Sequence, residues 1–318
     1  MANITGVKMA NHVGRILEDQ KPITADVFLT NYCNNRCKYC TYKRWDLGNS
    51  QKAISYDEFR KYATRLLELG VRGIILTGGG EPTLCPDFGK ITKWLEDEKI
   101  HYGINTNFNN LVYFKPDYLK VSLDGYDERS YSALRGVNMY RRVIDNIREY
   151  ADWKRENSPH TKLGIQWVAQ NVEDVSAFYD ANSSLPVDYI SFRPVESTDG
   201  KYYDVTELER AQKIKDKIIS MSRNDSRIIL NFKWDMLEKK QDTCIAQWAQ
   251  IAVNENGDVM YCCHKPYEVV GNIMDADILE KKRAAHTNMK MCDVPCRMTA
   301  PNEFVRSVLC TQEDSCFI

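Results

Sequence analysis

Three cysteines, Cys33, Cys37 and Cys40, lie within eight residues in a C-x3-C-x2-C spacing. They follow an apolar, β-branched run over 23–30, which predicts a buried strand, so they are expected on the loop that leaves its end. Thiolates are soft ligands, and closely spaced cysteines hold iron–sulfur clusters. Three cysteines would leave one iron of a four-iron cluster open to a small molecule. The alternatives fit less well, because zinc wants a fourth nearby ligand and a disulfide framework is typical of smaller, secreted chains.

A second motif, Gly78-Gly79-Gly80-Glu81-Pro82, follows another short apolar run over 73–77. Glycines let the backbone approach a ligand without a Cβ in the way, and the Glu81 carboxylate can accept hydrogen bonds from an ammonium group. A glycine triplet alone usually marks a turn. Here it comes one helix and one strand after the cysteines, with a capping box over 55–58 predicting the start of that helix. The order of the two motifs indicates one shared ligand site.

Strands and helices alternate along the next part of the chain. Further strands are predicted over 102–107, 118–124, 162–169, 187–193 and 227–232, and helices over 87–100, 127–150 (interrupted near Gly136), 172–181 and 206–221. A short helix is also predicted over 7–19. This alternation indicates parallel βαβ units, and ligands of such barrels lie at the carboxyl ends of the strands. The polar motifs follow predicted strands, as that arrangement requires.

The cysteine spacing and the glycine-rich stretch together resemble the motifs of the radical S-adenosylmethionine (radical SAM) superfamily. The resemblance implies a partial (β/α)6 TIM-like barrel of class α/β. It also implies a 4Fe–4S cluster held by Cys33, Cys37 and Cys40. The open iron would be chelated by the amino and carboxylate groups of the methionine part of SAM.

The same resemblance implies which other residues contact SAM. Tyr39, just before the third cysteine, is expected beside the adenine. Gly79, Gly80 and Glu81 match the stretch that binds the methionine amino group in the family.

Two further residues, one in the fourth predicted strand and one in the helix that follows it, also match the family. Ser122 and Arg135 are candidates for contacting the ribose and the methionine carboxylate. A surface salt bridge is the alternative for Arg135, and Asp124 either caps the following turn or touches a ligand.

Seven of the eleven cysteines lie in the last 75 residues. The stretch 251–262 predicts a β-hairpin with Asn256-Gly257 at its turn, which lets Cys262 approach Cys244. Cys292 and Cys296 can supply two more thiolates, and four cysteines fill a 4Fe–4S cluster.

This part of the chain resembles the C-terminal extensions called SPASM and twitch, which hold auxiliary clusters. The resemblance implies one auxiliary 4Fe–4S cluster on Cys244, Cys262, Cys292 and Cys296. The second half departs from the full SPASM spacing, so a second auxiliary cluster is not expected. Cys310 and Cys316 are alternative ligands, and four cysteines also suit zinc.

Three segments are therefore expected: an N-terminal segment over 1–22, a radical SAM core over 23–225 and a small iron–sulfur domain containing the hairpin over 226–318. Apolar residues make up 43% of the 318, enough for a substantial core. The formal net charge of −1 argues against nucleic-acid binding. The basic cluster Lys281-Lys282-Arg283 is interpreted as a solvated helix face.

Neither a membrane span nor a secretion signal is predicted, because the chain lacks a run of 18 apolar residues and a basic N-terminal region followed by an apolar stretch. Eleven cysteines without a signal favour reduced thiols and metal, and hence the cytoplasm. Low oxygen is expected, because exposed clusters oxidise.

The resemblance implies that SAM is reductively cleaved to a 5′-deoxyadenosyl radical, which takes a hydrogen atom from an organic substrate. Oxidation, epimerisation or bond formation can follow, with an electron donor such as flavodoxin or ferredoxin. Two spare thiols, Cys85 and Cys263, are candidates for returning a hydrogen atom to the substrate radical. An ordinary buried thiol is the alternative for each.

The substrate class implied by the resemblance is a peptide or an amino sugar or cyclitol. About 20 residues precede the first predicted strand, which argues against a peptide-leader-binding domain. Two other classes stay open: a radical enzyme that modifies a nucleic acid or nucleotide, and a non-catalytic iron–sulfur or zinc protein.

Overall fold

The computed structural model describes residues 12, 14–40, 42, 51–195, 205–231, 234, 237, 244–263, 265–288 and 299–309. The strands are β1 Thr24–Phe28, β2 Gly73–Thr77, β3 His101–Thr106, β4 Tyr118–Ser122, β5 Lys162–Ala169, β6 Tyr189–Pro194, β7 Ile228–Leu230, β8 Gln250–Val253, β9 Asp258–Cys262 and β10 Lys265–Asn272. The helices are α2 Tyr56–Glu68, α3 Phe88–Asp97, α4 Glu128–Arg135, α5 Tyr140–Asn157, α6 Val172–Asn182, α7 Val205–Ser222, α8 Ile278–Asn288 and α9 Thr299–Leu309. Three short helical turns complete the set: η1 Arg15–Asp19, η4 Pro82–Leu84 and η6 Ala246–Ala249.

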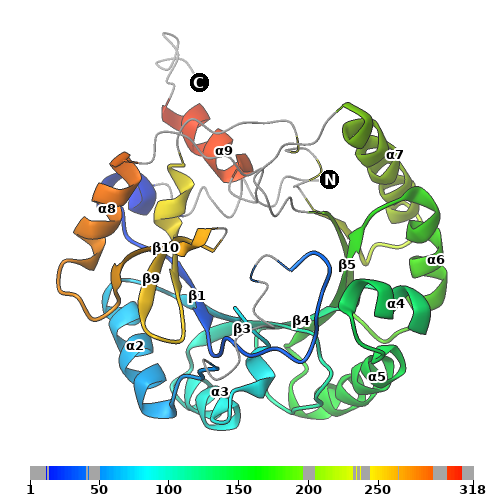
Figure 1. Ribbon diagram of the computed structural model, residues 1–318, viewed down its shortest axis with the longest axis horizontal. Coiled ribbons are helices and arrows are strands. Elements are labelled where there is room, and N and C mark those ends of the chain that lie inside the picture. Colours follow the sequence, from blue (N-terminus) through cyan, green and yellow to red (C-terminus); the bar gives the residue numbers. More distant parts are fainter. Residues whose placement is uncertain are drawn as a thin grey trace.

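All strands belong to one ten-stranded sheet in the order β10-β9-β8-β1-β2-β3-β4-β5-β6-β7. Strands β1 to β7 are parallel neighbours in chain order. The sheet curves into an open barrel, with α2 to α7 on its outer face (Figure 1). This is the predicted α/β architecture, a partial TIM-like barrel.

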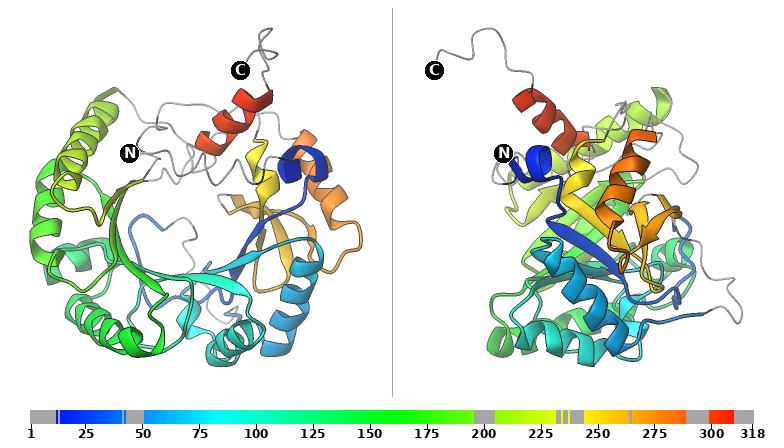
Figure 2. Two further views of the ribbon diagram at one scale, coloured as in Figure 1. Left: turned by 180° about the vertical axis from the view of Figure 1, so that it is seen from behind. Right: turned by 90° about the vertical axis from the view of Figure 1, so that its left-hand side faces the viewer.

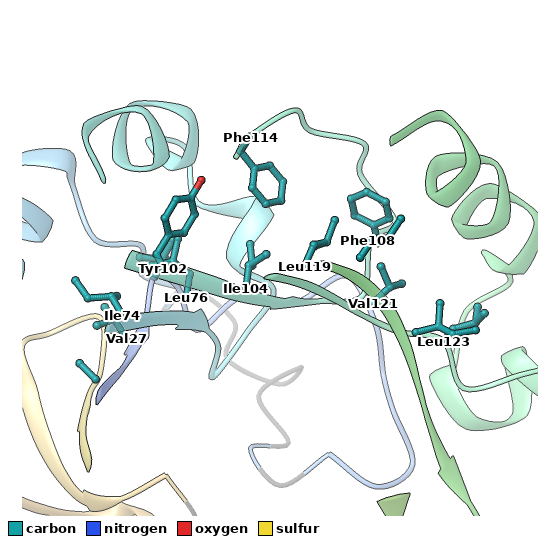
Figure 3. Close-up of a cluster of buried hydrophobic side chains, with 14 of the residues drawn as sticks. Val27, Ile74, Leu76, Tyr102, Ile104, Phe108, Phe114, Leu119, Val121 and Leu123 are labelled. Carbon is teal, nitrogen blue, oxygen red and sulfur yellow. The ribbon is translucent and has the colours of Figure 1, made fainter. Parts of the chain in front are cut away.

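Alternation along each strand separates the core from the barrel interior. The core side chains of β2, β3 and β4 stand between the sheet and the helices (Figure 3), as Ile74 and Leu76 of β2 illustrate. On β4, Leu119 and Val121 belong to this core, whereas Lys120 and Ser122 line the cavity inside the barrel. The period of two that predicts a strand therefore also decides which side chains reach a ligand.

The predicted capping box and the predicted interruption near Gly136 are confirmed, whereas the helix expected to end at residue 150 continues to Asn157. Ser55 and Glu58 form the capping box that begins α2. The long helix expected over 127–150 is two helices, because Gly136 ends α4 in the left-handed conformation. Of the helix expected over 7–19, the described residues form only the π-helical turn η1, and the others lie outside the described residues.

The predicted hairpin is also confirmed, as β8 and β9 pair antiparallel around the turn that contains Gly257. Two features were not predicted. Strand β10 extends the hairpin, and β8 pairs in parallel with β1, with Thr24 opposite Gln250. The C-terminal strands thus continue the barrel sheet, and Figure 2 shows them beside β1 with α8 packed on them.

In the described part of the chain, no helix combines the length and the apolar character that a bilayer crossing needs.

Candidate functional site

A cavity of about 370 Å³ lies inside the barrel at the carboxyl ends of the strands. It gathers most of the residues singled out in the sequence: Cys33, Cys37, Tyr39, Cys40, Gly79, Gly80, Glu81, Ser122, Asp124, Arg135 and Cys263. The sequence motifs, far apart along the chain, therefore meet in one place.

The cysteine loop is fixed against the glycine-rich stretch by backbone contacts. Gly80 N donates to the Thr30 carbonyl (2.9 Å) and Glu81 N to the Tyr32 carbonyl (2.8 Å). A Cβ on Gly80 would lie 1.9 Å from the carbonyl oxygen of Tyr32. The sequence predicted that a glycine here serves close approach to a ligand. In the structure, what approaches Gly80 is the backbone of the cysteine loop.

The end of helix α4 holds the other side of the loop. Arg36 N donates to the Arg135 carbonyl (2.9 Å) and Lys38 N to the Leu134 carbonyl (2.8 Å). The three cysteines are thus presented by a loop with backbone contacts on both sides.

The three thiols are half-buried and form no disulfide with one another. The backbone N–H of Asn35 donates to the Cys33 sulfur (3.4 Å), and Arg135 Nη1 donates to the Cys37 sulfur (3.2 Å). Burial raises the pKa of the Cys33 thiol to about 12. In the metal-free protein burial therefore favours the protonated thiol. A bound metal favours the thiolate instead, because it binds the sulfur and releases the proton.

Donor chemistry and placement fit an iron–sulfur cluster. Among the described residues, no three His, Cys, Asp or Glu side chains surround a point suited to a single metal ion. A four-iron cube is larger than one ion and spaces its ligands farther apart. Three soft thiols facing one cavity, with N–H donors directed at two of the sulfurs, match that larger group.

Glu81 is 2% exposed, and its carboxylate already accepts four hydrogen bonds. The donors are Thr83 N (3.2 Å), Thr83 Oγ1 (2.8 Å), Thr106 Oγ1 (2.5 Å) and Asn107 N (2.7 Å). Burial raises the pKa of Glu81, whereas these donors favour the carboxylate. Four donors match the roughly four lone-pair positions of a carboxylate, so Glu81 ties the glycine stretch to the end of β3.

Arg135 is buried, not part of a surface salt bridge. Its guanidinium pairs with Asp124 (2.8 Å) and also donates to the backbone carbonyl of Ser122 (2.5 Å). Asp124 accepts from Val168 N (2.9 Å), so it links β4 to β5. The turn before α4 is capped by Asp127 instead.

Tyr39 lines the cavity, and its hydroxyl donates to Gln170 Oε1 (3.2 Å) just after β5. This bond ties the cysteine loop to the residue that follows β5.

The two spare thiols differ. Cys263 lines the cavity, and its carbonyl accepts from the hydroxyl of Tyr42 (3.1 Å). Cys85 is buried outside the cavity lining, where its thiol donates to the Ile54 carbonyl (3.4 Å).

Sequence reasoning missed the side chains that hold the cysteine loop from β3. Asn107 Nδ2 donates to Asn34 Oδ1 (2.7 Å), and Asn109 Nδ2 donates to Asn35 Oδ1 (2.7 Å). Phe108 between them has a φ of 58°, which is unusual for a non-glycine residue. The polar residues at the end of the predicted third strand were the sequence feature that could have indicated these contacts.

The C-terminal site is described only in part. Cys244 and Cys262 are half-buried, and Asn302 Nδ2 donates to the Cys244 sulfur (3.4 Å). The other predicted ligands, Cys292 and Cys296, lie outside the described residues, as do Cys310 and Cys316.

A parallel partial barrel with three cysteines beside a glycine-rich stretch is the arrangement that the resemblance to radical SAM enzymes predicted. Residues 27–165 match the family model described as Radical SAM superfamily, so this segment is a radical SAM superfamily domain. The family implies a 4Fe–4S cluster and SAM as cofactors of the domain.

Curated relatives share this part of the chain. The GTP 3′,8-cyclase of Pectobacterium atrosepticum is 31% identical over 179 residues, which are 53% of this chain and 51% of that protein. The chain spans about half the length of the first curated relatives it matches.

Two solved structures share the fold. Streptococcus suis SuiB bound to the precursor peptide SuiA is 17% identical with a TM-score of 0.62, covering 87% of this chain and 69% of that one. Native anSMEcpe with bound AdoMet is 16% identical with a TM-score of 0.60, covering 91% of this chain and 97% of that one.

Proposed function

We propose that this protein is a radical SAM enzyme that abstracts a hydrogen atom from an organic substrate, a peptide or an amino sugar or cyclitol. When bound, the cluster supplies the electron that splits SAM into methionine and a 5′-deoxyadenosyl radical, the species that takes the hydrogen atom. The observation that carries the proposal is the meeting of the three thiols and the glycine stretch in one cavity.

In this proposal, different residues around the cavity would bind the cluster and SAM. Cys33, Cys37 and Cys40 would hold three irons. Tyr39 would lie beside the adenine and Ser122 beside the ribose. These assignments use side chains that line the cavity.

The methionine part of SAM would lie at the glycine stretch. Glu81 already accepts four hydrogen bonds, so in this proposal backbone carbonyls of Gly79 and Gly80, which line the cavity beside it, would accept from the ammonium. Arg135 would face the methionine carboxylate while it keeps Asp124 as its partner.

SAM cleavage tests this function. Anaerobically reconstituted protein, reduced with dithionite, should convert SAM to 5′-deoxyadenosine, measured by liquid chromatography and mass spectrometry. Cys37→Ala should abolish the product, whereas Cys85→Ala, outside the cavity lining, should retain it. Reduced, iron-loaded protein that leaves SAM intact would favour a non-catalytic iron–sulfur protein.

We propose Cys263 rather than Cys85 as the residue that returns hydrogen to the substrate radical. A C–H bond would form as the Cys263 S–H bond breaks. The resulting thiyl radical would regain one electron from a donor such as ferredoxin and one proton from water. Turnover in heavy water should place deuterium at the reacting carbon in wild type and Cys85→Ala. Wild-type product without solvent deuterium would exclude this role.

The C-terminal cysteines would hold an auxiliary cluster. We propose Cys244, Cys262, Cys292 and Cys296 as its ligands. The β8–β9 hairpin supports this choice, because it turns the chain back so that Cys262 can approach the segment that carries Cys244. Reconstituted protein should then bind about eight irons, as expected for two 4Fe–4S clusters.

A nucleotide substrate is the second candidate. Two observations favour it: curated relatives are named GTP 3′,8-cyclase, and the cationic side chains Lys120 and Arg193 line the cavity. Such a substrate would make the reaction a cyclisation and not an oxidation or epimerisation. Stimulation of 5′-deoxyadenosine release by GTP but not by peptides or aminocyclitols would select it.

A further inference from the structure

The cavity continues beyond the proposed SAM site as a row of polar side chains on three neighbouring strands. Thr77 of β2, Asn105 of β3 and Lys120 of β4 all line it. Asn105 lies opposite Lys120 in the strand register, and its Nδ2 donates to Thr77 Oγ1 at 3.5 Å. Lys120 precedes Ser122, the residue proposed beside the ribose of SAM, by two positions, or about 7 Å along the strand. A molecule that lies next to SAM can therefore reach the row.

Two tyrosine rings bound this polar row. A Cβ on Gly103 would lie 2.0 Å from the ring of Tyr118, and a Cβ on Gly164 would lie 2.1 Å from the ring of Tyr189. The members of each pair lie opposite each other in the strand register, and Lys120 lies opposite Gly164. Tyr118 therefore bounds the row on the side away from the SAM site, and Tyr189 bounds it across β5. The row is the inner end of the cavity.

The amide of Asn105 has an oxygen that the fold leaves unused. This Oδ1 atom is buried, and within the described residues it accepts no hydrogen bond. A buried acceptor without a donor costs free energy, so a donor is expected beside it. Because Asn105 lines the cavity, a molecule bound there can supply that donor.

The ammonium of Lys120 has the opposite requirement, because it can only donate. A group that binds both side chains must therefore donate to Asn105 and accept from Lys120. A hydroxyl does both with a single oxygen, whereas an ionised phosphate or carboxylate only accepts and an ammonium only donates. A trans backbone amide points its N–H and C=O in opposite directions, so it cannot serve two neighbours on one wall.

We propose that Asn105 and Lys120 form a subsite that binds a hydroxyl group of the substrate. The substrate is then a hydroxylated ring, which can be a cyclitol, an amino sugar or the ribose of a nucleotide. The inference rests on the proposed function, because it places the substrate in the cavity that holds SAM. It narrows the proposed substrates to those with ring hydroxyls and disfavours a peptide.

Binding to the cluster-loaded protein with SAM, without reductant, tests the subsite. Isothermal titration uses streptamine, glucosamine and GTP as hydroxylated probes, and cyclohexylamine and tetraglycine as probes without hydroxyls. At least one hydroxylated probe should bind, and the two others should not. Binding of GTP alone would assign the hydroxyl to a ribose, and binding of streptamine or glucosamine would assign it to a cyclitol or sugar. Failure of all three hydroxylated probes to bind would overturn the inference.

Substitution of Asn105 tests its role in that binding. Asn105→Leu should weaken the binding of the hydroxylated probe about tenfold, because one buried hydrogen bond is lost. Asn105→Ala, which adds no bulk, should weaken it similarly. The matched control is Asn157→Leu at the exposed end of α5, which should bind the probe as wild type does. Unchanged affinity in both Asn105 variants would overturn the inference.

Thermal unfolding without a probe separates binding from a structural role. Asn105→Leu should leave the unfolding midpoint unchanged or raise it, because the substitution removes a buried acceptor that has no donor. A midpoint lowered as far as the affinity loss requires would assign Asn105 to the fold and overturn the subsite.

The subsite and the proposed function fail differently, because binding without reductant needs no SAM cleavage. A protein that cleaves SAM but binds the probes equally well with and without Asn105 contradicts the subsite alone. A protein that binds a hydroxylated probe through Asn105 but never cleaves SAM contradicts the proposed function and leaves the subsite supported.

Discussion

Arg135 joins three parts of the site through one side chain. It pairs with Asp124, donates to the Ser122 carbonyl at the end of β4, and donates to the sulfur of Cys37. The family resemblance pointed to this arginine, but its partners could not be predicted, because they come together only in the tertiary structure. Its burial means that its loss would leave the Asp124 carboxylate without a counter-charge.

Replacing Arg135 by Met should destabilise the metal-free protein by about 3–5 kcal/mol, the usual effect of breaking a buried pair. The matched control is Arg141, which pairs with Glu128 (3.1 Å) on the surface. Arg141→Met should cost less than about 1 kcal/mol. Anaerobic urea unfolding measures both. Equal effects of the two substitutions would show that Arg135 and Asp124 are not a buried pair.

The β8–β9 hairpin carries Cys262 at its end and joins the barrel sheet through the pairing of β8 with β1. Its turn depends on Gly257, which has a φ of 81°. A Cβ there would lie 2.7 Å from the ring of Tyr62, whose hydroxyl donates to the Asn256 carbonyl (3.3 Å). Helix α2 and the hairpin thus meet at a position that needs glycine for its backbone and its space.

Gly257→Ala should lower the free energy of unfolding by about 1–3 kcal/mol, since a left-handed residue and a close contact are both strained. Gly89 in α3 is the control, because a Cβ there meets no atom within 4 Å. Gly89→Ala should be neutral or stabilise by up to about 1 kcal/mol. Chemical unfolding of both variants measures this. Similar destabilisation of the two would contradict the hairpin contact.

The connection from α7 into β7 contains a pH-dependent ion pair. Arg227 donates to Asp225 (2.7 Å) and is the main reason that the pKa of this carboxyl falls to about 2. A lowered carboxyl pKa stabilises the fold above the unfolded value near 4. That contribution is lost as the pH falls towards 2.

The stability difference between wild type and Asp225→Asn should therefore be larger at pH 6 than at pH 3. Unfolding of metal-free protein at both pH values tests this, with Asp152→Asn, an exposed partner of Arg155, as the control. A difference that stays constant across this range would argue against the pair.

At the scale of the whole molecule, local patterns predicted most elements and long-range contacts were missed. Each barrel strand and the capping box depend on a short contiguous stretch of sequence, so the local residue pattern predicts them. The pairing of β8 with β1 joins residues 24 and 250, and no local pattern encodes it. The same limit hid the burial of Lys282, because a basic triplet usually faces solvent. Lys282 is 1% exposed, so the prediction of a solvated helix face is wrong for this residue.

The candidate site divides in the same way. The positions of the three cysteines and of the glycine stretch were predictable, because each motif is contiguous. The four donors to Glu81 were not, because Thr106 and Asn107 reach it from the next strand.

The central claim is that SAM binds to the iron left open by Cys33, Cys37 and Cys40. Electron–nuclear double resonance on the reduced cluster, with SAM labelled with 15N in its amino group and 17O in its carboxylate, tests it most directly. We predict hyperfine coupling from both labels in wild type and none in the variant that replaces all three cysteines by alanine. A wild-type cluster without coupling to either label would contradict the account.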